Sequence, residues 1–121
     1  MKLVIITKTK LTTKPISTSF KKFTQREIET VSQLESESSE NPWTKNQLSA
    51  SVSNPNNLCY ALLVNSTIVG YIVAMLAVDS ADILNVAVHK DFKRNGYGSS
   101  LISHLSEELY CRNIKTIFLE V

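Results

Sequence analysis

One stretch of the sequence constrains the fold more than any other, because a short apolar run is followed by a glycine turn and then by an amphipathic segment. The apolar run covers residues 83–88, with Asn85 as its single polar residue. The turn at 93–99 reads Lys-Arg-Asn-Gly-Tyr-Gly-Ser and holds two of the three glycines in the chain. Apolar residues then recur at helical spacing, at Leu101, Ile102, Leu105 and Leu109. This pattern predicts a strand, a tight turn that glycine permits, and a helix.

Such a turn is suited to binding phosphate. The first turn of a helix carries backbone N–H groups without helical partners and the positive end of the helix dipole. A strand that leads through a glycine turn into a helix therefore forms a phosphate cradle. The dinucleotide fingerprint needs a third glycine after Gly96-Tyr97-Gly98, and the P-loop needs Gly-Lys-Ser/Thr; the sequence has neither. Dinucleotides and nucleoside triphosphates are therefore not the expected ligands.

The rest of the chain predicts a mixed α/β (α+β) fold in one domain. Strands are expected at 19–23, 58–64, 67–78, 82–89 and 114–121, and helices after the Thr24 and Thr44 capping boxes and over 98–112. The last strand–helix–strand unit implies a parallel pair with a right-handed crossover. We expect a mostly antiparallel sheet with flanking helices, formed by residues 18–121. Residues 1–17 are expected to be an N-terminal arm or an extra edge strand.

Composition excludes several classes of function. A net charge of +2 with scattered basic residues argues against a nucleic-acid partner. The longest apolar run, 68–78, is well short of the ~20 residues that span a membrane. Cys59 and Cys111 are too few for a disulfide framework and indicate reduced thiols in the cytoplasm. His89 and His104 lack the spacing of a metal site or a catalytic triad, so no metal is expected and structural or exposed roles are favoured.

The glycine turn resembles the pyrophosphate loop of the GNAT acyltransferases, in which a basic or amide residue is followed by x-x-Gly-x-Gly. Lys93 stands where that family usually has Gln or Arg. Leu-Asn-Val-Ala-Val at 84–88, Phe-Leu-Glu-Val at 118–121 and Asn-Pro-Trp-Thr at 41–44 are similar to the bacterial RimI-type branch. Members of that branch acetylate the N-terminal alanine of a small-subunit ribosomal protein. The similarity runs from about Ser19 to Val121.

The resemblance implies an N-acetyltransferase with acetyl-CoA as donor and a protein or peptide N-terminus as acceptor. The backbone of Val86, Ala87 and Val88 would pair with the pantetheine arm, and Glu120 would be the general base, acting through water. The pyrophosphate would be held by Arg94, Asn95, Gly96, Tyr97, Gly98 and Ser99. The chemistry agrees, because a carboxylate can accept the proton that an ammonium must lose before its nitrogen attacks a thioester. Strand N–H groups can polarise the thioester carbonyl.

Several residues keep two interpretations at this point. Glu120 could be a solvated polar residue, and Arg94 could contact phosphate or be a surface charge. Trp43 could be a packing anchor or a substrate contact. Asn85 could mark a distortion of its strand or contact a ligand.

The resemblance also implies something beyond Val121. Family members continue with a helix and two further strands, which carry an Asn that contacts the cofactor and a Tyr that serves as general acid. We therefore expect the final strand here to have an exposed edge, through which two copies could pair. The alternative functions are a non-catalytic acyl-CoA-binding module and a GNAT enzyme that acts on a different amine.

Overall fold

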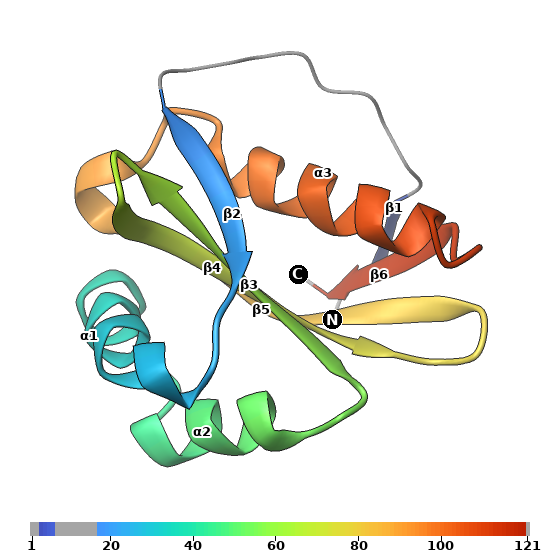
Figure 1. The fold of residues 1–121 in the computed structure, drawn as a ribbon, viewed down its shortest axis with the longest axis horizontal. Helices are drawn as coiled ribbons and strands as arrows, with labels where there is room; N and C mark the ends of the chain where they lie inside the picture. Colours follow the sequence, from blue (N-terminus) through green and yellow to red (C-terminus); the bar gives the residue numbers. More distant parts are fainter. Residues whose placement is uncertain (1–2, 7–16, 121) are drawn as a thin grey trace.

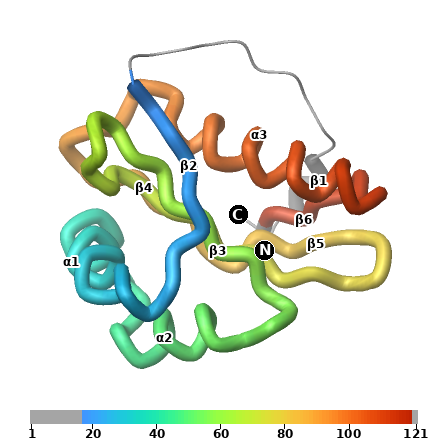
Figure 2. The backbone as a smooth tube through the Cα atoms, viewed as in Figure 1, coloured from blue at the N-terminus to red at the C-terminus, as the bar shows by residue number. Residues whose placement is uncertain are grey.

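The computed structural model describes residues 3–6 and 17–120 of the chain, which form one six-stranded sheet with helices on both faces (Figure 1). The elements are β1 (Leu3–Ile6), β2 (Thr18–Lys22), η1 (Gln25–Glu27), α1 (Ile28–Ser38), α2 (Lys45–Ser53), β3 (Asn57–Val64), β4 (Thr67–Leu76), β5 (Ser80–Val88), η2 (Lys90–Phe92), α3 (Tyr97–Tyr110) and β6 (Thr116–Glu120). The strand order is β1-β6-β5-β4-β3-β2. Helices α1 and α2 cover one face and α3 covers the other (Figure 2).

The topology confirms the predicted fold class. Strands β2 to β5 pair in sequence order as an antiparallel meander, and α3 carries the chain across to β6, which pairs with β5 in parallel. Both capping boxes form: at the second, Thr44 Oγ1 accepts from Gln47 N at 3.1 Å and Thr44 N donates to Gln47 Oε1 at 2.7 Å. Asn113 has a φ of 64°, which is the left-handed exit expected after α3.

The expectation of an exposed edge at the final strand is wrong. Strand β1 lies antiparallel to β6, with Leu3 opposite Glu120 and Ile6 opposite Ile117. The backbone groups that the final strand would otherwise leave unpaired therefore have a partner within the same chain. Residues 3–6 are an added edge strand, one of the two interpretations of the predicted arm. The rest of that arm, at 1–2 and 7–16, lies outside the described residues.

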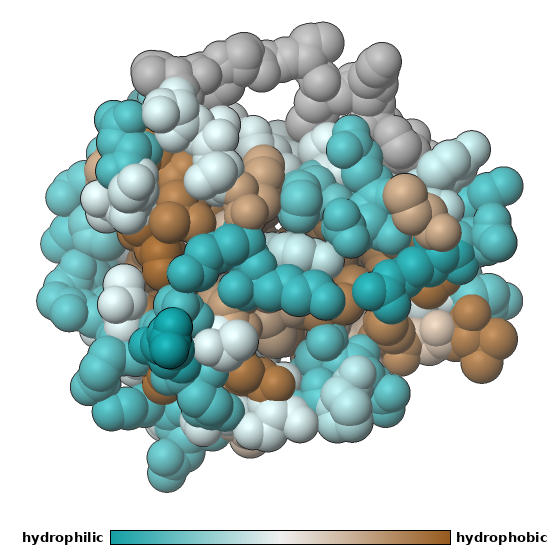
Figure 3. All heavy atoms as spheres, in the orientation of Figure 1, coloured by the Kyte–Doolittle hydropathy of each residue, from teal (hydrophilic) through white to brown (hydrophobic). Residues whose placement is uncertain are grey.

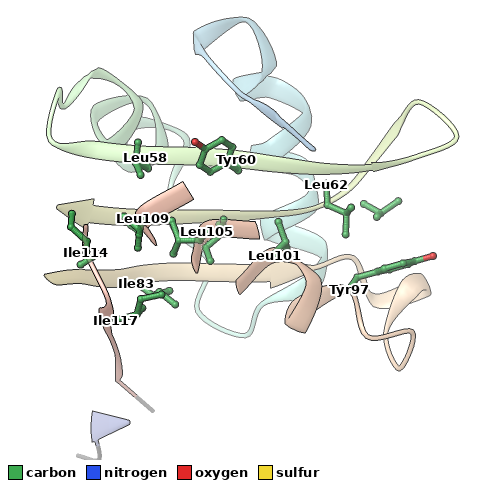
Figure 4. Close-up of a cluster of buried hydrophobic side chains, with 14 residues drawn as sticks. Leu58, Tyr60, Leu62, Ile83, Tyr97, Leu101, Leu105, Leu109, Ile114 and Ile117 are labelled. Carbon is green, nitrogen blue, oxygen red and sulfur yellow. The ribbon is translucent and has the colours of Figure 1, made fainter. Parts of the chain in front are cut away.

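The sheet separates two hydrophobic cores. On one face, α3 packs against β3 to β6, and Figure 4 shows Leu101, Leu105 and Leu109 projecting from the helix onto the strands. On the other face, α1 and α2 bury Val31 and Leu48 against Cys59, Ala61, Tyr71 and Val73 of β3 and β4. Hydrophilic residues cover much of the face drawn in Figure 3, and hydrophobic residues are visible in smaller areas between them. Among the helices of the described ranges, none has the length and apolar character needed to cross a bilayer.

Candidate functional site

The site is organised by an irregularity in β5. Ala74 of β4 pairs with Ile83, but the adjacent Val73 pairs with Asn85, so Leu84 is an extra residue in β5 and forms a β-bulge. The parallel ladder between β5 and β6 ends at the same level, with Ile83 opposite Leu119 as its last pair. Beyond the bulge, β5 is therefore paired along one edge only within the described part of the chain.

The open edge of β5 carries the three residues predicted to pair with a pantetheine arm. Val86, Ala87 and Val88 lie opposite Ile72, Tyr71 and Gly70 of β4. His89 N donates to Val69 O at 2.8 Å, so the backbone groups of His89 point toward β4. Because these groups alternate along an antiparallel strand, those of Val88 and Val86 face the open edge. This edge can accept an extended amide-bearing ligand as an additional strand would be accepted.

The glycine turn forms a cleft at the start of α3. Arg94 and Gly96 have positive φ angles, 69° and 76°, and Gly96 is the N-cap of the helix. Asn95 Nδ2 donates to Phe92 O at 3.0 Å and so closes the loop on itself. The cleft has a volume of about 350 Å³ and is lined by Val88, Phe92, Lys93, Arg94, Gly96, Tyr97, Gly98 and Ser99. Of the predicted cofactor residues, Val86, Ala87 and Asn95 do not line it.

The cleft fits a diphosphate. A side chain added at Gly96 would meet no atom within 4 Å, and one added at Gly98 would meet only Val88, at 3.9 Å. The backbone of the first helical turn is therefore open to a ligand at this point. Lys93 and Arg94 supply positive charge, and the unpaired N–H groups at the N-terminus of α3 supply donors. The cleft therefore offers a diphosphate both positive charge and direct access to backbone N–H groups.

Glu120, the predicted general base, is the last residue of β6 and pairs with Leu3. It comes directly after Leu119, the residue at which the β5–β6 ladder ends. The backbone thus brings Glu120, the β5 bulge and the open edge of β5 to one region of the sheet.

A buried polar network lies on the α1/α2 side of the bulge, and the sequence interpretation missed most of it. Glu35 of α1 is only 1% exposed. Its carboxylate accepts from Tyr71 Oη at 2.8 Å, from Asn85 Nδ2 at 3.3 Å and from Trp43 N at 3.0 Å. Asn85 Nδ2 also donates to Tyr71 Oη at 2.7 Å. Burial, and then the bond to Glu35, raise the pKa of Tyr71, so its hydroxyl stays protonated as a donor.

A signal for this network was present in the sequence. Glu35 follows Ile28 by seven residues and Val31 by four, so it occupies the apolar stripe of its helix. A carboxylate in a core-facing position needs hydrogen-bond donors, which predicts buried polar partners. Asn85 adjoins a distortion of its strand, which supports the first of its two interpretations, whereas a contact with a ligand stays a prediction. Trp43 packs against the core on the α1/α2 face.

The two histidines have structural contacts, as favoured. His89 Nε2 lies 2.9 Å from Glu37 Oε1, and Lys90 N donates to Ser38 Oγ at 3.2 Å, so the end of α1 is tied to the end of β5. The bond from His89, and a second from Gln33, lower the pKa of Glu37. His104 stacks on Phe20 with ring centroids 4.2 Å apart. Across the described ranges, no three His, Cys, Asp or Glu side chains come together in a way that could hold a metal ion.

Comparisons with known proteins agree with this arrangement. The profile of the acetyltransferase (GNAT) family matches residues 23–121. The ribosomal protein bS18-alanine N-acetyltransferase of Escherichia coli K12 is 32% identical over 80 residues, which cover 66% of this chain and 53% of that protein. The Salmonella typhimurium enzyme of the same name is 35% identical over 60 residues, covering 50% of this chain and 40% of that protein. The chain thus spans about half the length of the curated relatives it matches.

Solved structures share the fold. The crystal structure of the ribosomal-protein-S18-alanine N-acetyltransferase from Escherichia coli superposes with a TM-score of 0.81 at 24% identity, covering 86% of this chain and 66% of that one. The PaiA N-acetyltransferase of Thermoplasma acidophilum, in complex with coenzyme A, superposes with a TM-score of 0.78 at 19% identity. The superposition covers 88% of this chain and 80% of that one.

Proposed function

The chain belongs to the acetyltransferase (GNAT) family, and from this premise we propose that it is an N-acetyltransferase that transfers acetyl from acetyl-CoA to a protein N-terminus. The observation that carries the proposal is the continuity of two features. The open edge of β5 ends in the charged cleft at the start of α3. A ligand with an extended amide arm and a diphosphate matches both features at once.

Acetyl-CoA supplies an acetyl group that is activated as a thioester. We assign its diphosphate to the cleft at 94–99 and its amide arm to the open edge of β5 at 86–88, where the backbone groups of Val86 and Val88 face outward and those of Ala87 point toward β4. Lys93 at the start of the loop keeps a positive charge but lacks the planar fork of arginine, so backbone N–H groups contribute most of the diphosphate binding.

Glu120 is the residue to which we assign the general base. A protonated amine has no free lone pair, and a carboxylate at the end of β6 can accept its proton, directly or through water. The strand N–H groups at the bulge can stabilise negative charge that develops on the acetyl oxygen. These roles require no covalent bond to the protein.

The acceptor class is supported by the relatives. Both curated relatives described above bear the name ribosomal protein bS18-alanine N-acetyltransferase, and we propose an alanine N-terminus of a small-subunit ribosomal protein as the acceptor here. Cys59 and Cys111 are both free thiols, which suits action in the cytoplasm.

The test is acetyl transfer to a short peptide with a free N-terminal alanine, followed by mass spectrometry. The same peptide with a blocked N-terminus should gain no acetyl group. Glu120→Gln should lower kcat by about a hundred-fold or more, because a positioned general base contributes roughly 10²–10⁴. The matched control is Glu107→Gln on the exposed side of α3, which should leave kcat unchanged.

Other outcomes would assign a different function. Transfer to small amines or lysine side chains, without transfer to the peptide N-terminus, would indicate a GNAT enzyme for another acceptor. Calorimetric binding of CoA without transfer to any amine would indicate an acyl-CoA-binding module. A folded chain that binds no CoA would overturn the proposal.

A further inference from the structure

The buried network fixes which way the amide of Asn85 points. Its Nδ2 has two hydrogens, and the two acceptors within reach are Tyr71 Oη at 2.7 Å and a Glu35 carboxylate oxygen at 3.3 Å. The reversed amide would place Oδ1 against the carboxylate, where both atoms are acceptors. Tyr71 has already committed its single proton to Glu35 Oε1 at 2.8 Å, so it can only accept from Asn85. The orientation is therefore determined by its neighbours.

The same network leaves the carbonyl oxygen of Asn85 available. Asn85 Oδ1 makes no hydrogen bond to any described residue, although Nδ2 makes two. Among the described residues, Asn57 Oδ1 is the fully buried side-chain polar atom that lacks a hydrogen-bond partner. Asn85 Oδ1 also lacks a partner but is not fully buried. Asn85 is partly exposed, so this oxygen is an unused acceptor that is not sealed within the core, on an otherwise immobilised side chain.

The position of this oxygen is what gives it significance. Asn85 directly follows the bulged Leu84, where the ladder to β6 has ended, and directly precedes the open edge that begins at Val86. Its bond to Glu35 of α1 places it on the α1/α2 face, whereas Val86 and Val88 pack against the core on the α3 face. A substrate that approaches the bulge from the α1/α2 face meets Asn85 beside the donor edge.

We propose that Asn85 Oδ1 accepts a hydrogen bond from the N–H of the acceptor amine and so positions that amine at the β5 bulge. This inference rests on the proposed acetyl transfer. An ammonium or amine offers N–H donors, which the available carbonyl complements. A neutral carbonyl also holds the amine without raising its pKa as strongly as a carboxylate would, so the amine can still lose its proton. Glu35 and Tyr71 are positioning residues, which act through Asn85.

The experiment measures acceptor binding separately from turnover. Calorimetry on the CoA-loaded protein would compare a short peptide with a free N-terminal alanine and a copy in which a propionyl group replaces that alanine, so that the N-terminal amine is absent. Asn85→Ala should weaken binding of the free peptide about ten-fold or more, the effect of one hydrogen bond to a charged donor. The propionyl copy, which lacks the N–H donor, should bind both proteins equally, and CoA affinity should stay within about two-fold. Asn46→Ala, an exposed amide on α2, is the matched control.

A second measurement tests the inference without the Asn85→Ala variant, in case that variant does not fold. In the wild-type protein, titration with the free peptide should shift the Asn85 side-chain amide resonances in NMR spectra, and titration with the propionyl copy should not. Tyr71→Phe should raise KM for the peptide with little change in kcat, because it loosens the amide without removing it.

The outcomes separate this inference from the proposed function. Equal affinity of Asn85→Ala for the free peptide, or an unshifted Asn85 amide on saturation with that peptide, overturns the inference and leaves acetyl transfer standing. Peptide binding that depends on Asn85 without transfer by the wild-type chain supports the inference and overturns the proposed activity.

Discussion

The cores on the two faces of the sheet contain different kinds of side chain. On the α3 face the core consists mainly of apolar side chains, from Leu58 on β3 to Ile117 on β6, with only Ser106 as a buried polar residue and the Tyr60 hydroxyl bonded to Glu108 at its margin among the described residues. On the α1/α2 face the core surrounds a buried carboxylate, Glu35, with a phenol and an amide bonded to it. The difference indicates how each side contributes to function. The α3 face holds a helix whose backbone N-terminus forms the cleft, whereas the α1/α2 face fixes a side chain at the bulge.

This contrast has an energetic meaning. Apolar packing is non-directional and tolerates a change of shape if volume is kept. A buried carboxylate with three donors is directional, and removing one acceptor leaves buried donors unpaired. The substitutions below test whether the two faces respond in these different ways.

The largest effect is expected at the centre of the α3 face. Leu105 is fully buried, so Leu105→Ala should lower the free energy of unfolding by about 2–5 kcal/mol through lost burial and a residual cavity. Urea denaturation measures it. Leu105→Met, which keeps the volume, should cost less than about 1.5 kcal/mol. A methionine variant as unstable as the alanine variant would show that this face also depends on specific geometry.

The next effect concerns the polar face. Glu35→Gln keeps the shape of the side chain but exchanges one acceptor oxygen for a donor that faces other donors. It should lower the free energy of unfolding by about 1–3 kcal/mol, more than Leu105→Met does. Glu29→Gln, on the exposed side of the same helix and paired with Lys45, should change it by less than about 0.5 kcal/mol. Equal values for the two glutamates would contradict the network's role.

A smaller change in the free energy of unfolding is expected at the cleft. Two alanine variants there distinguish backbone strain from loss of space for the ligand. Gly96→Ala should cost about 1 kcal/mol, because its φ of 76° strains an L-residue although nothing lies within 4 Å of the new Cβ. Gly98→Ala should not destabilise the fold, since its Cβ meets only Val88 at 3.9 Å, but it should weaken CoA binding by occupying the cleft. Thermal melting and calorimetry on both variants distinguish the two effects. CoA affinity unchanged in both would remove the diphosphate from this cleft.

The smallest effect is a pH dependence on the α3 face. Burial lowers the pKa of His104, so between its folded pKa and the unfolded value of about 6.5 the unfolded chain binds more protons than the folded one. The stability contributed by neutral His104 is therefore full above about pH 6.5 and declines as pH falls through the folded pKa. His104→Phe, which keeps the stacking on Phe20, should flatten denaturation midpoints between about pH 7.5 and pH 5.5. A slope unchanged in the variant would assign the dependence to other groups.

Much of the fold could be predicted because its signals are local. The capping boxes at Thr24 and Thr44, the left-handed Asn113 and the glycine turn each depend on residues within a few positions of one another. The crossover between β5 and β6 follows from chain length and handedness alone. Predicted boundaries are within about three residues of those observed, because the ends of elements depend on tertiary contacts.

The pairing that covers the edge of β6 and the buried polar network could not be predicted from local sequence patterns. Pairing of β1 with β6 joins the two ends of the chain, and no local pattern in residues 3–6 specifies that partner. Glu35, Tyr71 and Asn85 are separated by 14 to 50 positions, so their bonds exist only after sheet and helix have packed.

The sequence by itself determined that a strand, a glycine turn and a helix form a phosphate cradle, because backbone conformation there is set by glycine and by helix geometry. Tertiary structure alone decided that Leu84 bulges out of β5 and that the adjacent Asn85 is held by a buried carboxylate. Register and burial are properties of the assembled sheet, where each strand's position depends on its neighbours.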